Sequence, residues 1–204
     1  MNTCTMWEIE DTLYETGVKV ICGVDEAGRG PLAGPVCAAA VILPPHIQIP
    51  GLNDSKKLTD KRRRELFPVI IENALAYGIG LADHTEVDQI NILQATYLAM
   101  ERALAQLCIK PDIALIDGNR TKDFGLPVQT VVKGDSLSAN IAAASVLAKV
   151  TRDDVMVQMA DSYPQYGFEV HKGYGTKAHY EAIAQHGPCS IHRMTFLKKL
   201  YGTK

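Results

Sequence analysis

Three short apolar segments of this chain each lead into acidic residues, at the end of the segment or within three positions of it, and this repetition constrains its fold more than any other feature. The segments are residues 18–25, 112–117 and 128–132, and their acids are Asp25 with Glu26, Asp117 and Asp135. β-branched and small apolar residues without helical periodicity are typical of strands buried on both faces of a sheet. Because open α/β sheets place their chemistry at the carboxyl ends of strands, we expect the four carboxylates to converge on one site.

Carboxylates crowded at a buried edge are unfavourable unless a positive charge joins them, and a divalent cation is the simplest partner. No His or Cys stands at ligand spacing among these acids, so Mg²⁺ or Mn²⁺ is favoured over zinc. Taken singly, Asp117 or Asp135 is as easily explained as a turn-capping residue. The repetition at three strand ends favours the metal site.

The remaining pattern completes an α/β arrangement. We predict strands over 36–43 and 77–84, the first antiparallel to the strand over 18–25, and helices over 59–77, 85–108, 139–162 and 177–186. Pro68 is expected to kink or divide the helix over 59–77. We divide the chain into an α/β domain, residues 1–163, and a helical C-terminal extension, residues 164–204.

Composition narrows the class of protein. The chain has 204 residues, is 47% hydrophobic and 22% charged, and carries a net charge of −2, which is typical of an ordinary globular protein. The longest apolar run, residues 36–43, is too short to span a bilayer, and five cysteines without C-x-x-C spacing indicate a reducing compartment. We therefore expect a cytoplasmic protein without a membrane partner, and nothing demands more than a monomer.

Glycines crowd the segment that follows the first acids. Gly28, Gly30 and Gly34 indicate a backbone that turns sharply or approaches a ligand closely. A Rossmann nucleotide-binding loop is disfavoured because the G-x-G-x-x-G register is absent and Pro31 stands where a helix should begin.

Five sequence blocks resemble the signature blocks of bacterial ribonuclease HII, in order and over nearly the whole chain. They are DEAGRGPLAGPV at 25–36, NDSKKL at 53–58, IDGN at 116–119, KGDSLSANIAAASVLAKVTRD at 133–153 and HKGYGTKAH at 171–179. The resemblance implies an α/β ribonuclease H-like fold, with a five-stranded mixed sheet flanked by helices and a small helical C-terminal extension.

The resemblance also implies a reaction. Asp25, Glu26, Asp117 and Asp135 would be the catalytic, metal-binding carboxylates, holding two Mg²⁺ or Mn²⁺ ions when substrate is bound. The substrates would be RNA/DNA hybrid duplexes and duplex DNA containing ribonucleotides. Cleavage would fall on the 5′ side of a ribonucleotide and leave 3′-hydroxyl and 5′-phosphate ends.

Substrate contacts are implied at three further places. The backbone of Gly28, Arg29 and Gly30 would contact the ribose 2′-hydroxyl, and Tyr174 would close on the same ribose and stack on the next sugar. Without the resemblance, the GYG segment is as easily explained as a turn with an interfacial aromatic. The phosphate contacts that we predict are Ser55, Lys56, Lys149 and Arg152.

Other interpretations stay open from sequence. Ribonuclease HIII shares the acidic site but usually carries an additional N-terminal domain, whereas 24 residues precede Asp25 here. A DNA-cutting nuclease of the ribonuclease H fold and a non-catalytic nucleic-acid-binding module are further alternatives.

The C-terminal region from His171 carries six Lys or Arg and one acid, which suits binding to a polyanion or a solvated helix face. For His171, His179 and His192, a surface or capping role is favoured over phosphate contact.

Overall fold

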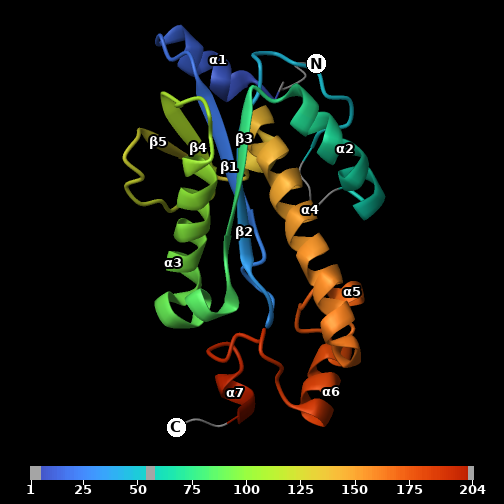
Figure 1. Ribbon diagram of the computed structural model, residues 1–204. Coiled ribbons are helices and arrows are strands. Elements are labelled where there is room, and N and C mark those ends of the chain that lie inside the picture. Colours follow the sequence, from blue (N-terminus) through green and yellow to red (C-terminus); the bar gives the residue numbers. More distant parts are fainter. Residues whose placement is uncertain (1–5, 54–57, 202–204) are drawn as a thin grey trace.

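The computed structural model describes residues 6–53 and 58–201, and it is built around one five-stranded mixed sheet (Figure 1). The strands are β1 Ile21–Ala27, β2 Val36–Ile42, β3 Ala76–Ala82, β4 Ile113–Asp117 and β5 Val128–Val131, in the spatial order β3-β2-β1-β4-β5. β2 pairs antiparallel with β1 and β3, while β4 pairs parallel with β1 and β5. The predicted fold class and the antiparallel pairing of the first two strands are confirmed.

Helices cover both faces of the sheet. They are α1 Glu8–Glu15, α2 Asp60–Asn73, α3 His84–Ala105, α4 Ala139–Ser162, α5 Phe168–His171, α6 Lys177–His186 and α7 Lys198–Tyr201, with 3₁₀ turns η2 Gly134–Ser136 and η3 Pro164–Tyr166. Thr59 caps α2 as predicted, and Pro68 does not divide this helix. In Figure 1, α3 lies on one side of the strands and α4 on the other.

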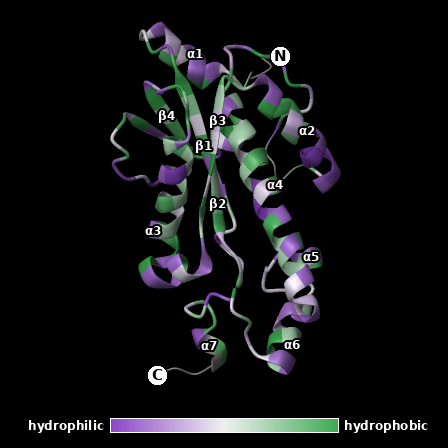
Figure 2. Ribbon diagram, viewed as in Figure 1, coloured by the Kyte–Doolittle hydropathy of each residue, from purple (hydrophilic) through white to green (hydrophobic). Residues whose placement is uncertain are grey.

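Alternation along the strands separates two apolar cores. Cys22 and Val24 of β1 join the cluster packed against α3, whereas Cys37 and Ala39 of β2 join the cluster packed against α4. Helix α4 lies so close to β1 that a Cβ at Gly23 would stand 2.1 Å from the Asn140 carbonyl carbon. Figure 2 shows the hydrophobic colour concentrated on the central strands between these helices.

A buried acid ties α1 to the start of α4. Glu10 is fully buried, and its Oε1 accepts hydrogen bonds from Ser138 Oγ at 2.6 Å and Asn140 Nδ2 at 3.0 Å. A carboxylate at a helix N-terminus is stabilised by the free backbone N–H groups and the helix dipole. This contact helps to fix the end of α4 that lies next to Asp135.

The C-terminal extension shares a core with the glycine-rich loop that follows β1. Leu32 and Ala33 of that loop pack with Met156 of α4 and with Phe168 and Ile191 of the extension. Helix α4 ends at Ser162, next to the boundary that we predicted after residue 163; the division into two domains stays a prediction. Among the described residues, no helix is long and apolar enough to cross a membrane.

Candidate active site

Three aspartates from three separate elements meet at one edge of the sheet. Asp25 lies in β1, Asp117 ends β4, and Asp135 lies on η2. One carboxylate oxygen from each lies within 4.8 Å of the other two. The parallel pairing of β1 with β4 runs to Val24 and Ile116, so Asp25 and Asp117 are the next residues on neighbouring strands.

Backbone geometry brings Asp135 to the other two. Lys133 takes a left-handed conformation with φ 58°, which turns the chain between β5 and η2. The N–H of Gly134 then donates to Asp117 Oδ1 at 2.7 Å. A similar bond, from Glu26 N–H to Asp25 Oδ1 at 2.7 Å, orients the first carboxylate. The cluster is therefore held in place by the main chain.

The chemistry of this cluster fits a hard divalent cation. Asp25 and Asp135 are each only 3% exposed, and all three groups offer oxygen ligands. Like charges so close together disfavour one another, and a bound cation relieves the repulsion. Mg²⁺ and Mn²⁺ prefer carboxylate oxygens, so the residues present suit the predicted ions.

Glu26 is not part of this close group, although we predicted that all four acids converge; it lines the same pocket as Asp25 and Asp117. It follows Asp25 inside β1, and successive side chains of a strand point to opposite faces of the sheet. Its Oε1 accepts a hydrogen bond from Arg29 Nη1 at 3.1 Å, and the side chain lines a pocket next to α3. Its role as a metal ligand stays a prediction.

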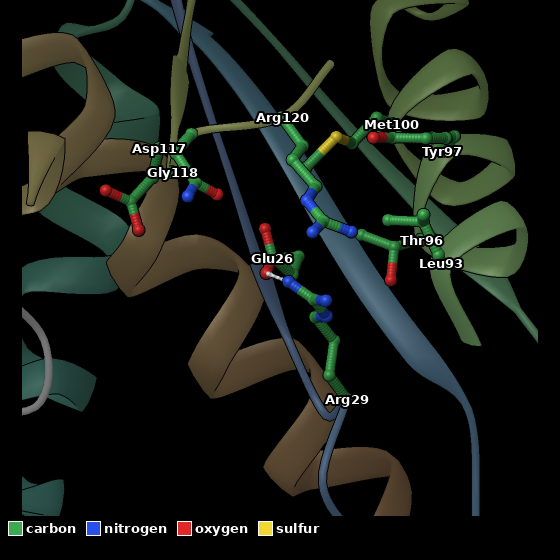
Figure 3. A pocket seen from close by; sticks show the side chains of 10 residues that line it. Glu26, Arg29, Leu93, Thr96, Tyr97, Met100, Asp117, Gly118 and Arg120 are labelled. Carbon is green, nitrogen blue, oxygen red and sulfur yellow. Dashed lines mark hydrogen bonds and ion pairs between the residues drawn. The ribbon is translucent and has the colours of Figure 1, made fainter. Parts of the chain in front are cut away.

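Two pockets meet at these acids. The first, about 240 Å³, is lined by Asp25, Glu26, Ala27, Gly28, Arg29, Gly30, Asp117, Ser145, Lys149 and Tyr174. The second, about 350 Å³, shares Glu26, Arg29 and Asp117 with the first and extends along α3. Figure 3 shows Arg29 and Arg120 entering the second pocket from different sides. Sequence reasoning missed Arg120 and Ser145.

The glycine loop and Tyr174 lie together in the first pocket, although nearly 150 positions separate them in the sequence. A Cβ at Gly30 would meet only Tyr174 Cε1, at 3.8 Å. Tyr174 is 41% exposed, and Lys149 Nζ lies 5.6 Å from the centroid of its ring. The residues that we predicted to recognise ribose therefore face the same space as Asp25.

The four predicted phosphate contacts have different outcomes. Lys149 lines the first pocket, where its Nζ is 2.7 Å from Asp153 Oδ1. Ser55 and Lys56 lie outside the described residues. Arg152 is fully buried and donates hydrogen bonds to the carbonyls of Ala33, Pro35 and Lys172, so this burial does not agree with a direct phosphate contact.

His179 and His192, for which we expected a surface or capping role, form a buried hydrogen-bonded series that ends at the Tyr174 carbonyl. His179 and His192 are 0% and 1% exposed. Cys189 N–H donates to His192 Nδ1 at 2.9 Å, the two Nε2 atoms of His192 and His179 are 3.1 Å apart, and His179 Nδ1 bonds the Tyr174 carbonyl at 2.9 Å. These contacts suit neutral rings, each with one donor and one acceptor nitrogen.

Because these histidines are buried and neutral, we predict that the protein loses folding stability in mild acid. Burial, followed by the nearby His171 and His192, lowers the pKa of His179 from 6.5 to about 4. Between these values the unfolded chain binds more protons, so the free energy of unfolding falls as the pH falls, by about 1.4 kcal/mol per pH unit for this group. Urea unfolding between pH 7.5 and 4.5 measures the effect. His179→Gln does not titrate and should flatten the dependence; an equally steep dependence in the variant would contradict this origin.

Comparisons with known proteins point to one family. The family model described as ribonuclease HII matches residues 22–199. A ribonuclease HII from Caldicellulosiruptor saccharolyticus is 51% identical over 95% of this chain and 95% of its own length, and one from Shewanella amazonensis is 59% identical over 86% and 85%. The crystal structure of ribonuclease H2 from Pyrococcus horikoshii is 28% identical, has a TM-score of 0.72, and covers 91% of this chain and 100% of its own.

Proposed function

The chain belongs to the ribonuclease HII family, and on that premise we propose how it selects and cuts its substrate. It is an endoribonuclease that acts on RNA/DNA hybrids. We propose that it hydrolyses the phosphodiester on the 5′ side of a ribonucleotide, in hybrids and at single ribonucleotides in duplex DNA, leaving 3′-hydroxyl and 5′-phosphate ends. The pocket that joins Asp25 and Asp117 to Gly28, Arg29, Gly30 and Tyr174 carries the proposal.

In this proposal Asp25, Asp117 and Asp135 hold the divalent cations, with Glu26 contributing from the adjoining pocket. Two Mg²⁺ or Mn²⁺ ions, when bound with substrate, lower the pKa of the attacking water and neutralise charge on the leaving 3′ oxygen. The protein's own contribution is a rigid arrangement of oxygens, because Asp25 and Asp117 each accept a main-chain hydrogen bond.

Ribose recognition falls to the loop beside the acids. The 2′-hydroxyl distinguishes RNA from DNA, and the backbone of Gly28, Arg29 and Gly30 can reach it because no Cβ stands in the way. The exposed ring of Tyr174 lies against Gly30 and is placed to contact the sugar. Cleavage is therefore coupled to ribose, because the sugar-binding loop starts one residue after Ala27, the end of the strand that holds Asp25.

Basic side chains around the two pockets position the phosphate backbone. Arg29 and Arg120 line the larger pocket, and Lys149 lines the smaller one. Such contacts set the register of a duplex without reading its bases.

We further propose that the protein acts as a monomer, since all these groups come from one chain. We also propose a cytoplasmic location. It suits the substrates, RNA/DNA hybrids and DNA that contains ribonucleotides, and the free thiols of Cys22, Cys37, Cys108 and Cys189.

A cleavage assay on two matched duplexes tests the function. One duplex carries a single embedded ribonucleotide and the other is all DNA. With Mg²⁺ or Mn²⁺ we expect a single nick on the 5′ side of the ribonucleotide, no nick in the all-DNA duplex, and no activity with chelator. Cleavage of both duplexes would instead indicate a DNA-cutting nuclease of the same fold.

Removal of the Tyr174 hydroxyl tests its part in recognition. Tyr174→Phe keeps the ring beside Lys149 but loses one hydrogen-bonding group. Since one net hydrogen bond is worth about 1 kcal/mol, we expect kcat/KM at a single embedded ribonucleotide to fall about fivefold. Binding to the all-DNA duplex should change little. An equal loss on both duplexes would exclude a role in discrimination.

A further inference from the structure

A buried arginine of the C-terminal extension holds the glycine loop from behind. Arg193 is 0% exposed, and its guanidinium donates to the carbonyls of Gly28 at 2.6 Å, Arg29 at 3.0 Å, Pro31 at 3.0 Å and Gly34 at 2.9 Å. Its own N–H donates to the Leu32 carbonyl at 2.8 Å. One side chain from the far end of the sequence therefore contacts most of the loop.

These bonds determine where the loop's own donors point. A trans peptide unit is planar, so its C=O and the following N–H point in opposite directions. Because Arg193 binds the carbonyls of Gly28 and Arg29, the N–H groups of Arg29 and Gly30 face away from it. Within the described part of the chain, neither N–H has a hydrogen-bond acceptor, and both residues line the pocket that contains Asp25.

The cost of burying this cation indicates that the contact is specific. Burial, and then the neighbouring Arg152, lower the pKa of Arg193 to about 9. Among the described residues it forms no ion pair with an acid, so carbonyl oxygens compensate its charge. A lysine cannot replace it, because a single ammonium lacks the planar fork that reaches several carbonyls at once.

We propose that Arg193 is a positioning residue for ribose recognition: it turns the N–H groups of Arg29 and Gly30 into the pocket, where both donate to an oxygen of the ribonucleotide. The inference rests on the proposed function and extends it to a residue outside the pocket. It also gives the C-terminal extension a part in specificity, since that segment supplies the guanidinium.

Binding to two duplexes that differ by one 2′-hydroxyl tests this role. Both are measured in an Asp117→Asn background, which prevents cleavage. The parent should prefer the ribonucleotide-containing duplex by about tenfold or more, as expected for two hydrogen bonds. Arg193→Lys should reduce this preference to within about twofold of unity, while its Kd for the all-DNA duplex changes less than about twofold.

The possible results distinguish the positioning role of Arg193 from the proposed recognition of ribose. A preference that Arg193→Lys retains, or an equal loss of affinity for both duplexes, overturns the positioning role alone. A parent protein without any preference overturns the proposed recognition as well. Ile70→Ala is the matched control for stability: Ile70 is fully buried in the cluster against α4, so this variant should lower the melting temperature and keep the preference.

A second measurement uses the intact chain in case Arg193→Lys does not fold. Amide exchange measured by NMR in the Asp117→Asn protein reports on Arg29 and Gly30 directly. Both amides should exchange rapidly in the free protein, become protected by the ribonucleotide-containing duplex, and stay unprotected with the all-DNA duplex. Equal protection by both duplexes, or none, would overturn the assignment of these donors.

Discussion

Asp25→Asn is expected to lower the cleavage rate at an embedded ribonucleotide by about 10³-fold or more, because it removes a charged ligand from the centre that stabilises the transition state. Asparagine keeps the size of the side chain and an acceptor oxygen for the Glu26 N–H, so the fold should be retained. Duplex binding should be unchanged or stronger, since one negative charge facing a polyanion is lost. Single-turnover cleavage and fluorescence anisotropy measure the two quantities.

The same variant links the cation to stability. In the parent, Mn²⁺ at 100 times its Kd should raise the free energy of unfolding by about 2.7 kcal/mol, and chelator should remove this gain. Asp25→Asn should lose most of the gain, and without metal it should be at least as stable as the parent, because the like-charge repulsion is relieved. Asp161→Asn, an exposed change of equal charge on α4, is the control and should behave as the parent does. Full cleavage by Asp25→Asn would exclude a catalytic role for this acid.

Gly30→Ala is expected to abolish ribose selectivity without destabilising the protein. The added methyl would meet only Tyr174 Cε1 at 3.8 Å, an ordinary contact, so the free energy of unfolding should change by less than about 1 kcal/mol. It would, however, stand in the pocket beside the N–H donors. We expect kcat/KM at an embedded ribonucleotide to fall by about 100-fold, because two hydrogen bonds and a close approach are lost.

Gly28→Ala is the contrasting variant on the same loop. Gly28 has φ +93°, and a Cβ there would lie 2.5 Å from Arg152 Nε and 2.8 Å from the Pro35 carbonyl oxygen. The unfavourable backbone conformation alone costs about 1–2 kcal/mol, and the clashes add to it. Urea unfolding should therefore separate the two alanines. If Gly30→Ala were the less stable variant, or kept full selectivity, the assigned geometry of the loop would be wrong.

Several elements follow from the sequence because their causes are local. β-branched and small residues over 18–25 and 112–117 favour buried strands, and the short connection to residues 36–43 favours antiparallel pairing. Residues at matching positions of neighbouring parallel strands lie side by side, which explains why Asp25 and Asp117, the residues after the pair Val24 and Ile116, meet as predicted. The family resemblance added the substrate and the significance of Tyr174.

The group of three close carboxylates leaves out Glu26 for a local reason, and its role as a metal ligand stays a prediction. We placed it beyond the end of a strand over 18–25, where its direction is free, but β1 extends from Ile21 to Ala27. Inside a strand, alternation sends it to the face opposite Asp25. The strand starts later than predicted because the N–H groups of Lys19 and Val20 donate to Asp112 Oδ2, an acceptor more than 90 residues away.

The strands, the aspartates that we propose as metal ligands and the glycine loop beside them could be predicted from the sequence, because backbone preference and side-chain chemistry are properties of neighbouring residues. The burial and contacts of Arg152, Arg193 and His179 could be seen in the folded structure alone. Arginine and histidine are polar residue types that are often found at protein surfaces. These three are buried because folding supplies backbone partners for their polar atoms from other segments. The carbonyls that Arg193 binds belong to residues 28–34, about 160 positions away in the sequence. They form the glycine-containing loop that follows Asp25 and Glu26.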